Sequence, residues 1–315
     1  MNDRSHKIVC PLVTPFTDGE VDTEALAGIV EYLVDAGIDG LLPCGTAGEF
    51  AALTREEFLT VVETTVDAAG DTPVVAGTCH TAVGEVIDRV EMAADAGASG
   101  VMMVPPYYDK ATEPKGDERF FRAIADASPV PMYLYNFPSR VGQSIDIETV
   151  VELADHDSVV GIKDTSGDMT FFGELLRRTP DEFDVYQGYD TQYIPGVAMG
   201  ADGGIHVLAH VIPDAFHSSV EAVEAGDLDR ARSIQFETIA PLFQQCMKHG
   251  FAPTVKAILA EQDRIPSREV RPPQLPLEDT EAVMETLDSG QETLRRFSLD
   301  AMWEPMRGDE PIRDD

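Results

Sequence analysis

The chain has 315 residues, of which 43% are apolar and 25% are charged, so we expect a sizeable core rather than disorder. Acidic residues outnumber basic ones by 57 to 23, and the net charge of -34 argues against nucleic acid or an anionic membrane as a partner. Such a surface repels itself in dilute buffer and is screened in concentrated salt, because the Debye length falls from about 10 Å at 0.1 M to about 3 Å at 1 M. The composition therefore indicates a soluble, halophilic protein.

The start of the chain and its cysteines indicate the compartment. The first residues become apolar too late and too briefly for a signal peptide, and no stretch is apolar over the roughly 18 residues of a membrane span. The four cysteines lie far apart with no CxxC pair, which argues against a zinc ribbon or a disulfide framework: Cys10, Cys44, Cys79 and Cys246. We therefore expect a cytoplasmic protein with reduced core thiols.

Short apolar segments of strand type alternate with helical patterns along the first two thirds of the chain. Eight strands are predicted, over residues 8–14, 40–44, 73–77, 100–105, 131–136, 159–164, 183–188 and 203–208. Residues that commonly cap helices precede the first three helical patterns, namely Asp22 or Thr23, Thr54 and Thr81. Each of these patterns ends at a glycine, as a C-cap requires: Gly37, Gly70 and Gly97.

Repeated strand–helix units predict an α/β fold of the (β/α)8 TIM-barrel type over residues 1–225. A doubly wound open sheet is the alternative that this pattern leaves open. Helical patterns continue over residues 226–300 and predict a C-terminal helical extension. Residues 301–315 are charged and interrupted by proline, which favours a disordered tail.

Catalytic groups of such barrels lie at the carboxyl ends of the strands, and the sixth predicted strand ends with Lys163 and Asp164. A lysine there can simply extend its amine to solvent or pair with Asp164. A lysine desolvated at the mouth of a barrel instead has a lowered pKa, and its free amine can attack a ketone. We therefore interpret Lys163 as a Schiff-base nucleophile.

The preceding strand ends with Tyr135, and Arg140 follows it, so both side chains are expected at the same mouth. Tyr135 can be an ordinary core tyrosine and Arg140 a solvated loop residue. Beside an imine lysine, however, a tyrosine can move protons and an arginine can bind a substrate carboxylate through two hydrogen bonds.

The second predicted strand leads into the small-residue loop Cys44–Glu49. Such a loop is most often a tight turn between a strand and a helix. Its backbone N–H groups can also bind a carboxylate, and the Thr46 hydroxyl can pass a proton to Tyr135. The combination of Lys163, Tyr135 and Thr46 favours the catalytic interpretation.

Five motifs in order resemble the dihydrodipicolinate synthase and N-acetylneuraminate lyase family of pyruvate-dependent class I aldolases, over roughly residues 7–300. They are LVTPF at 12–16, CGTAGE at 44–49, PPYY at 105–108, LYNFP at 134–138 and GIKDTSGD at 161–168. The resemblance implies that Lys163 forms the imine with pyruvate, that Tyr135 shuttles protons and that Thr46 relays them. It also places Tyr108, or alternatively Tyr107, where synthase members have a catalytic tyrosine that crosses a tight dimer interface.

The resemblance further implies a substrate-binding set. The backbone of Thr46 and Ala47 would hold the pyruvate carboxylate, Ile205 and Gly188 would line the pyruvate end, and Arg140 matches the arginine with which the synthases bind aspartate semialdehyde. The implied substrates are a keto acid and an aldehyde, without cofactor or metal, in a homodimer or homotetramer.

Three departures concern the substrate. Ala47 replaces a threonine of the loop, residues 187–190 read QGYD, and His206 follows Ile205 where a small polar residue is common. CGTAGEF, KDTSGD and QGYD resemble archaeal aldolases of 2-keto-3-deoxy sugar acids, and the acidic composition fits that group. We therefore predict cleavage of 2-keto-3-deoxygluconate to pyruvate and an aldehyde; the alternatives are 4-hydroxy-tetrahydrodipicolinate synthase and a keto-acid dehydratase.

Two other classes of function stay open. A metal-dependent aldolase would need clustered ligands, and His80, His206 and His210 do not have the spacing of a chelating set. A barrel that only binds a keto acid would not need Tyr135 and Thr46 beside Lys163.

Overall fold

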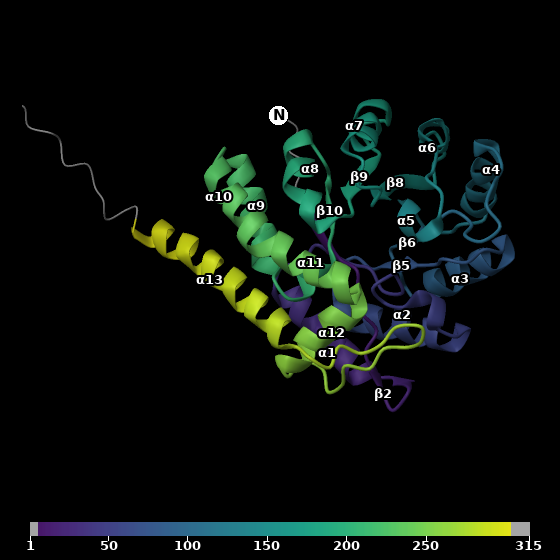
Figure 1. The fold of residues 1–315 in the computed structure, drawn as a ribbon. Coiled ribbons are helices and arrows are strands. Elements are labelled where there is room, and N and C mark those ends of the chain that lie inside the picture. The colour runs from purple at the N-terminus through teal and green to yellow at the C-terminus, as the bar shows by residue number, and fades with distance from the viewer. Residues whose placement is uncertain (1–5, 304–315) are drawn as a thin grey trace, which may run out of the picture.

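The computed structural model describes residues 6–303, and side chains as far as residue 297. Eight strands form one parallel sheet in the order β4-β1-β10-β9-β8-β7-β6-β5. They are β1 (Lys7–Cys10), β4 (Gly40–Leu41), β5 (Val75–Gly77), β6 (Gly100–Met103), β7 (Met132–Asn136), β8 (Val159–Asp164), β9 (Asp184–Gln187) and β10 (Gly203–Ile205). A parallel bridge between Leu41 and Val74 joins the two edges of the sheet. The sheet is therefore a closed (β/α)8 barrel, as predicted, and not the open doubly wound alternative (Figure 1).

Each predicted strand is present, although most are shorter at the carboxyl end than their apolar segments. The register places Tyr135 of β7 beside Lys163 of β8, and Lys163 beside Tyr186 of β9. Because all these strands are parallel, their carboxyl ends open at one end of the barrel. The register thus brings Tyr135 and Lys163 to the same mouth.

Helices surround the barrel. They are α1 (Thr23–Asp35), α2 (Arg55–Ala69), α3 (Val83–Asp95), α4 (Pro114–Ala125), α5 (Pro138–Val141), α6 (Ile147–Ala154), α7 (Met169–Arg178), α8 (Tyr193–Met199) and α9 (Pro213–Glu224). Asp22 caps α1, and Thr54 forms a capping box with Glu57 at the start of α2. The prediction for Thr81 was wrong: α3 begins at Val83 after Ala82, whose side chain cannot accept a hydrogen bond.

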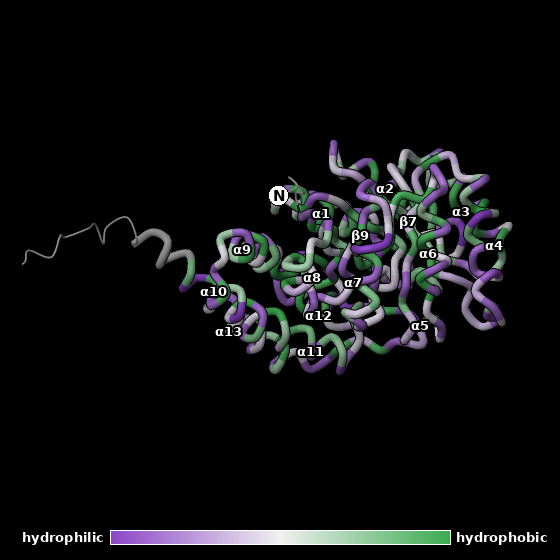
Figure 2. Tube along the Cα trace, turned by 90° about the horizontal axis from the view of Figure 1, so that it is seen from above, coloured by the Kyte–Doolittle hydropathy of each residue, from purple (hydrophilic) through white to green (hydrophobic). Residues whose placement is uncertain are grey.

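Further helices extend the barrel along one side, opposite α3 and α4 (Figure 2). They are α10 (Leu228–Ser233), a π-helical segment η4 (Ile234–Ile239), α11 (Ala240–His249), α12 (Phe251–Glu261) and α13 (Glu281–Trp303). Helix α13 continues three residues into the segment predicted as a tail, and residues 304–315 lie outside the described part of the chain. The C-terminal helices pack on one another, and α10 and η4 contact α9 of the barrel.

Short elements complete the described chain. A two-stranded antiparallel hairpin, β2 (Phe16–Thr17) with β3 (Glu20–Val21), was not predicted, and neither were the 3-10 turns η1 (Phe50–Ala52), η2 (Asp190–Gln192) and η3 (Val207–His210). All four cysteines are buried free thiols, as expected. Between residues 6 and 303, none of the helices combines the length and the apolar character needed to cross a membrane.

Candidate active site

A pocket with about 540 Å³ of empty space, which includes open solvent, lies at the carboxyl ends of the barrel strands. Strand ends, the loops after them and two C-terminal helices contribute its lining. Among the residues that line it are Thr46, Ala47, Tyr135, Lys163, Thr165, Gly188, Tyr189, Asp190, Ile205, Phe243 and Phe251. Most of the residues predicted for the site are therefore brought together in one pocket.

Lys163 contributes a basic side chain to the lining of this pocket, and the residue is 6% exposed. Within the described residues its amine forms no salt bridge; it stands over the ring of Tyr135, 4.4 Å from the centroid. The alternative pairing with Asp164 does not occur, because the Asp164 carboxylate accepts hydrogen bonds from Asn136 Nδ2 (2.8 Å) and Ser166 Oγ (2.8 Å). The amine is therefore left facing the pocket.

Burial gives this amine nucleophilic character. Desolvation lowers the pKa of Lys163 from 10.5 to about 8, although the Asp190 carboxylate favours the charged form. At neutral pH about a tenth of the amine is therefore unprotonated, against roughly one part in three thousand for an ordinary lysine. Imine formation requires this unprotonated amine.

Tyr135 is 5% exposed, and its ring stacks on Phe137 with the centroids 5.6 Å apart. Burial raises the pKa of Tyr135 above its ordinary value, and the hydroxyls of Thr46 and Thr165 partly offset that rise. The phenol is thus protonated at neutral pH and able to donate. Its neighbours Thr46 and Thr165 are groups through which a proton can be passed.

The loop after β4 is held in a sharp turn. Its ends, Cys44 and Glu49, both have φ of +56°, in the left-handed region that non-glycine residues rarely occupy. A Cβ on Gly48 would lie 2.8 Å from the Leu12 carbonyl oxygen, and Thr14 Oγ1 donates to the Gly48 carbonyl (2.8 Å). The turn brings Thr46 and Ala47 to the wall of the pocket.

Gly188 and Ile205 close the pocket around the lysine. A Cβ on Gly188 would lie 1.9 Å from Thr165 Oγ1 and 2.9 Å from Lys163 Cε. Real Cβ contacts are never so short, so only glycine leaves room for the lysine stem at this point. Ile205, which is buried at the end of β10, adds an apolar wall.

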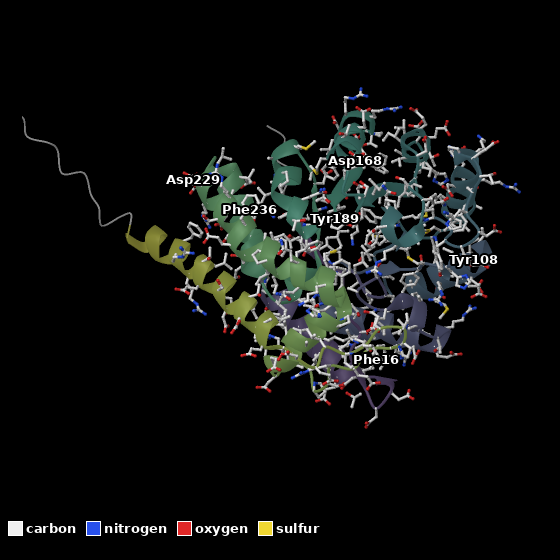
Figure 3. All side chains as sticks on the ribbon, in the orientation of Figure 1. Phe16, Tyr108, Asp168, Tyr189, Asp229 and Phe236 are labelled. Atoms are coloured by element: carbon white, nitrogen blue, oxygen red, sulfur yellow. The ribbon has the colours of Figure 1, made fainter. Side chains whose placement is uncertain are left out.

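Two predicted site residues lie outside the pocket of the single chain. Tyr108 is 98% exposed with φ of +81°, and in Figure 3 it lies at the periphery of the molecule, away from Tyr189. Arg140 is exposed in α5, with its guanidinium 5.9 Å from the ring centroid of Phe251, a residue of the pocket wall. Arg140 thus stands near the rim, and Tyr108 projects into solvent.

Several lining residues were not predicted as site residues, and four of them are Thr165, Asp190, Phe243 and Phe251. Thr165 and Asp190 lie in the motifs KDTSGD and QGYD, whose position after strand ends was an available signal. Phe243 and Phe251 come from α11 and α12, and no local pattern in the sequence indicates that these helices cover the barrel mouth.

His206, one of the three departures that bear on substrate, lies behind the pocket wall. His206 is fully buried between the rings of Tyr193 and Phe216, with centroids 4.5 Å and 4.8 Å away, and it is not a lining residue. Its Nδ1 is 3.8 Å from Asp190 Oδ2. His206 therefore does not contact a substrate in the pocket directly; its link to the pocket is through the lining residue Asp190.

The two other histidines considered as metal ligands, His80 and His210, have structural partners. Val13 N–H donates to His210 Nε2 (3.1 Å), and His210 Nδ1 bonds the Val207 carbonyl (2.8 Å). Burial lowers the pKa of His210 to about 4, so this ring is neutral. His80 accepts a hydrogen bond from the Ala82 N–H. Across residues 6–297, whose side chains are described, no three His, Cys, Asp or Glu side chains are grouped as metal ligands would be.

Comparison with known proteins agrees with this geometry. The profile of the dihydrodipicolinate synthetase family matches residues 4–288. The 4-hydroxy-tetrahydrodipicolinate synthase of Natronomonas pharaonis is 43% identical over 228 residues, which are 72% of this chain and 77% of the relative. The synthase of Methanosarcina barkeri is 40% identical over 272 residues, covering 85% of this chain and 92% of the relative.

Solved structures agree as well. The 4-hydroxy-tetrahydrodipicolinate synthase of Methylacidiphilum fumariolicum superposes with a TM-score of 0.87 at 30% identity, covering 93% of this chain and 98% of that one. The chain is a carbon–carbon lyase of the aldolase type that forms a lysine Schiff base with pyruvate. It belongs to the dihydrodipicolinate synthetase family.

Proposed function

We propose that the protein is a 4-hydroxy-tetrahydrodipicolinate synthase, which condenses pyruvate with aspartate semialdehyde, and that Lys163 is its Schiff-base residue. The observation that carries the chemistry is a buried amine without a salt bridge in the described chain, facing the ring of Tyr135. The relatives favour this substrate pair over the sugar acid that the loop motifs suggested, because those that match most of the chain are named as this synthase.

In the first step the free amine of Lys163 attacks the keto carbon of pyruvate, and loss of water from the carbinolamine gives the imine. The backbone N–H groups of Thr46 and Ala47 hold the pyruvate carboxylate. Removal of a methyl proton gives the enamine, whose carbon then bonds to the aldehyde carbon. Hydrolysis returns the amine, and cyclisation of the adduct releases water.

Tyr135 supplies and takes the protons of these steps, with Thr46 as its relay. The hydroxyls of Thr46 and Thr165 both interact with the phenol of Tyr135, and both lower its pKa against the effect of burial. Tyr108 extends the relay from a second copy of the chain. Its 98% exposure and left-handed backbone suit a side chain held out for a neighbouring protomer, whereas Tyr107 is half-buried against Phe50 (6.3 Å between ring centroids). The functional unit is therefore at least a homodimer.

Arg140 binds the second substrate. Its position beside Phe251, at the rim of the pocket, suits a group that meets the carboxylate of aspartate semialdehyde after pyruvate is bound. A bidentate pair with a carboxylate is worth about 2 to 3 kcal/mol, while a hydrogen bond to a neutral sugar hydroxyl is worth about 1.

The experiment offers the purified protein pyruvate with aspartate semialdehyde and, separately, 2-keto-3-deoxygluconate. We expect condensation of the first pair, and a fall in kcat/KM of about a hundredfold in Arg140→Ala. The matched control is Arg177→Ala, which removes an exposed arginine paired with Glu174 on α7. Efficient cleavage of 2-keto-3-deoxygluconate, with at most about a tenfold loss in Arg140→Ala, would contradict the synthase assignment.

A further inference from the structure

A second buried lysine, Lys256 of α12, lies behind the small-residue loop. It is fully buried, and its Nζ donates to Glu49 Oε1 (2.6 Å) and to the Glu269 carbonyl (2.8 Å). The same nitrogen stands 4.2 Å from the centroid of the Phe16 ring. Unlike the amine of Lys163, the amine of Lys256 has a carboxylate partner, and Lys256 does not line the pocket.

The other oxygen of the same carboxylate is also held by the C-terminal part of the chain. Glu49 Oε2 accepts from the backbone N–H of Arg271 (2.8 Å). The Arg271 guanidinium in turn lies over Phe16, 4.3 Å from its centroid, and pairs with Glu57. Residues more than 200 positions away in the sequence thus fix both oxygens of Glu49.

Glu49 is the residue that ends the carboxylate-binding turn. Its φ of +56° is unfavourable for a side chain with a Cβ, so the conformation needs an external restraint. Its N–H reaches the Thr46 carbonyl (3.3 Å), and the next N–H, that of Phe50, reaches the Gly45 carbonyl (3.3 Å). The backbone of Thr46 and Ala47 is therefore shaped by the conformation that Glu49 adopts.

We propose that Lys256 is a positioning residue for pyruvate: by holding the Glu49 carboxylate it keeps Glu49 left-handed and aims the Thr46 and Ala47 N–H groups at the substrate carboxylate. The C-terminal helices then complete the active site as well as the fold. This inference rests on the proposed role of the loop in pyruvate binding.

The test compares KM for pyruvate with kcat in three variants. Lys256→Met removes the ammonium and leaves a buried carboxylate uncompensated, so its stability falls. The double variant Lys256→Met with Glu49→Gln removes both charges and is expected to melt near the wild type. In both variants kcat/KM for pyruvate should fall at least about tenfold, carried mainly by KM, because binding rather than chemistry is disturbed.

The matched control is Glu57→Gln. It breaks the ion pair of Arg271 with α2 and so loosens the same C-terminal segment, but it leaves both contacts of Glu49 in place. We expect a lower melting temperature with an unchanged KM.

A normal KM in the double variant, or an equal rise of KM in Glu57→Gln, would overturn the inference and leave Lys256 a stabilising residue only. Borohydride trapping of pyruvate separates this result from failure of the function itself. If the wild type is trapped at Lys163 and the variants bind pyruvate normally, the positioning role alone is wrong. If the wild type is not trapped, the proposed function is wrong.

Discussion

Replacing the proposed Schiff-base lysine by methionine should inactivate the enzyme and stabilise its fold. Lys163 is 6% exposed, and burial lowers its pKa from 10.5 to about 8. Each pKa unit corresponds to about 1.4 kcal/mol, so the folded protein carries a cost of about 3 kcal/mol for keeping this ammonium out of water. Methionine fills a similar space without the charge. Lys163→Met should therefore raise the free energy of unfolding by up to about 3 kcal/mol at pH 7.

The stability gained in Lys163→Met should decrease as pH rises. Below about pH 8 the lysine is charged in both the folded and the unfolded chain, and the full cost applies. Between about pH 8 and 10.5 the folded wild type releases the proton while the unfolded chain keeps it, so the wild type becomes more stable as pH rises. The advantage of Lys163→Met should shrink across this window and disappear above it.

The assay is urea unfolding of both proteins between pH 7 and 10.5 in molar salt, with Lys256→Met as the matched control. Lys256 is also buried, and burial lowers its pKa to about 8 as well, but its removal leaves the Glu49 carboxylate buried without its ammonium partner. Lys256→Met should therefore destabilise the fold by roughly 3 to 5 kcal/mol. The reasoning would be refuted if Lys163→Met lowered the free energy of unfolding at pH 7, or if its effect on that free energy did not change with pH. Either result would mean that the buried Lys163 ammonium does not destabilise the fold.

Three further results are expected. Tyr135→Phe should leave pyruvate binding largely intact but slow turnover by about 10² to 10⁴, and near-normal turnover would contradict the proton relay. Gly188→Ala should abolish pyruvate trapping, because the added methyl would lie 1.9 Å from Thr165 Oγ1; calorimetric binding of pyruvate by this variant would contradict that reasoning. Melting temperatures should fall steeply as KCl is lowered from molar to 0.1 M, given the net charge of -34, and a flat profile would argue against salt adaptation.

The barrel and the centre of its site could be predicted because local patterns carry both. Strand-type segments alternate with capped helices, and parallel strands direct their carboxyl ends to one mouth, which brings Tyr135 and Lys163 together. The pairing of Tyr135 with Lys163 on adjacent strands then places the Lys163 amine 4.4 Å from the centroid of the Tyr135 ring. Neither step needs information from distant parts of the chain.

Contacts between distant segments could not be predicted in this way. The pairing of Lys256 with Glu49 joins residues 207 positions apart, and the cover of Phe243 and Phe251 depends on how the last helices pack. His206 was counted among the departures that bear on substrate because it follows a strand end, whereas its ring turns into the core beside Phe216.

The measurement that tests the account most directly is reduction of the protein with borohydride in the presence of pyruvate, followed by peptide mapping. The account predicts one covalent adduct, on Lys163, that is absent from Lys163→Met and forms faster as pH rises toward about 8. An adduct on Lys256 or Lys248, or the absence of any adduct while the protein remains active, would contradict it.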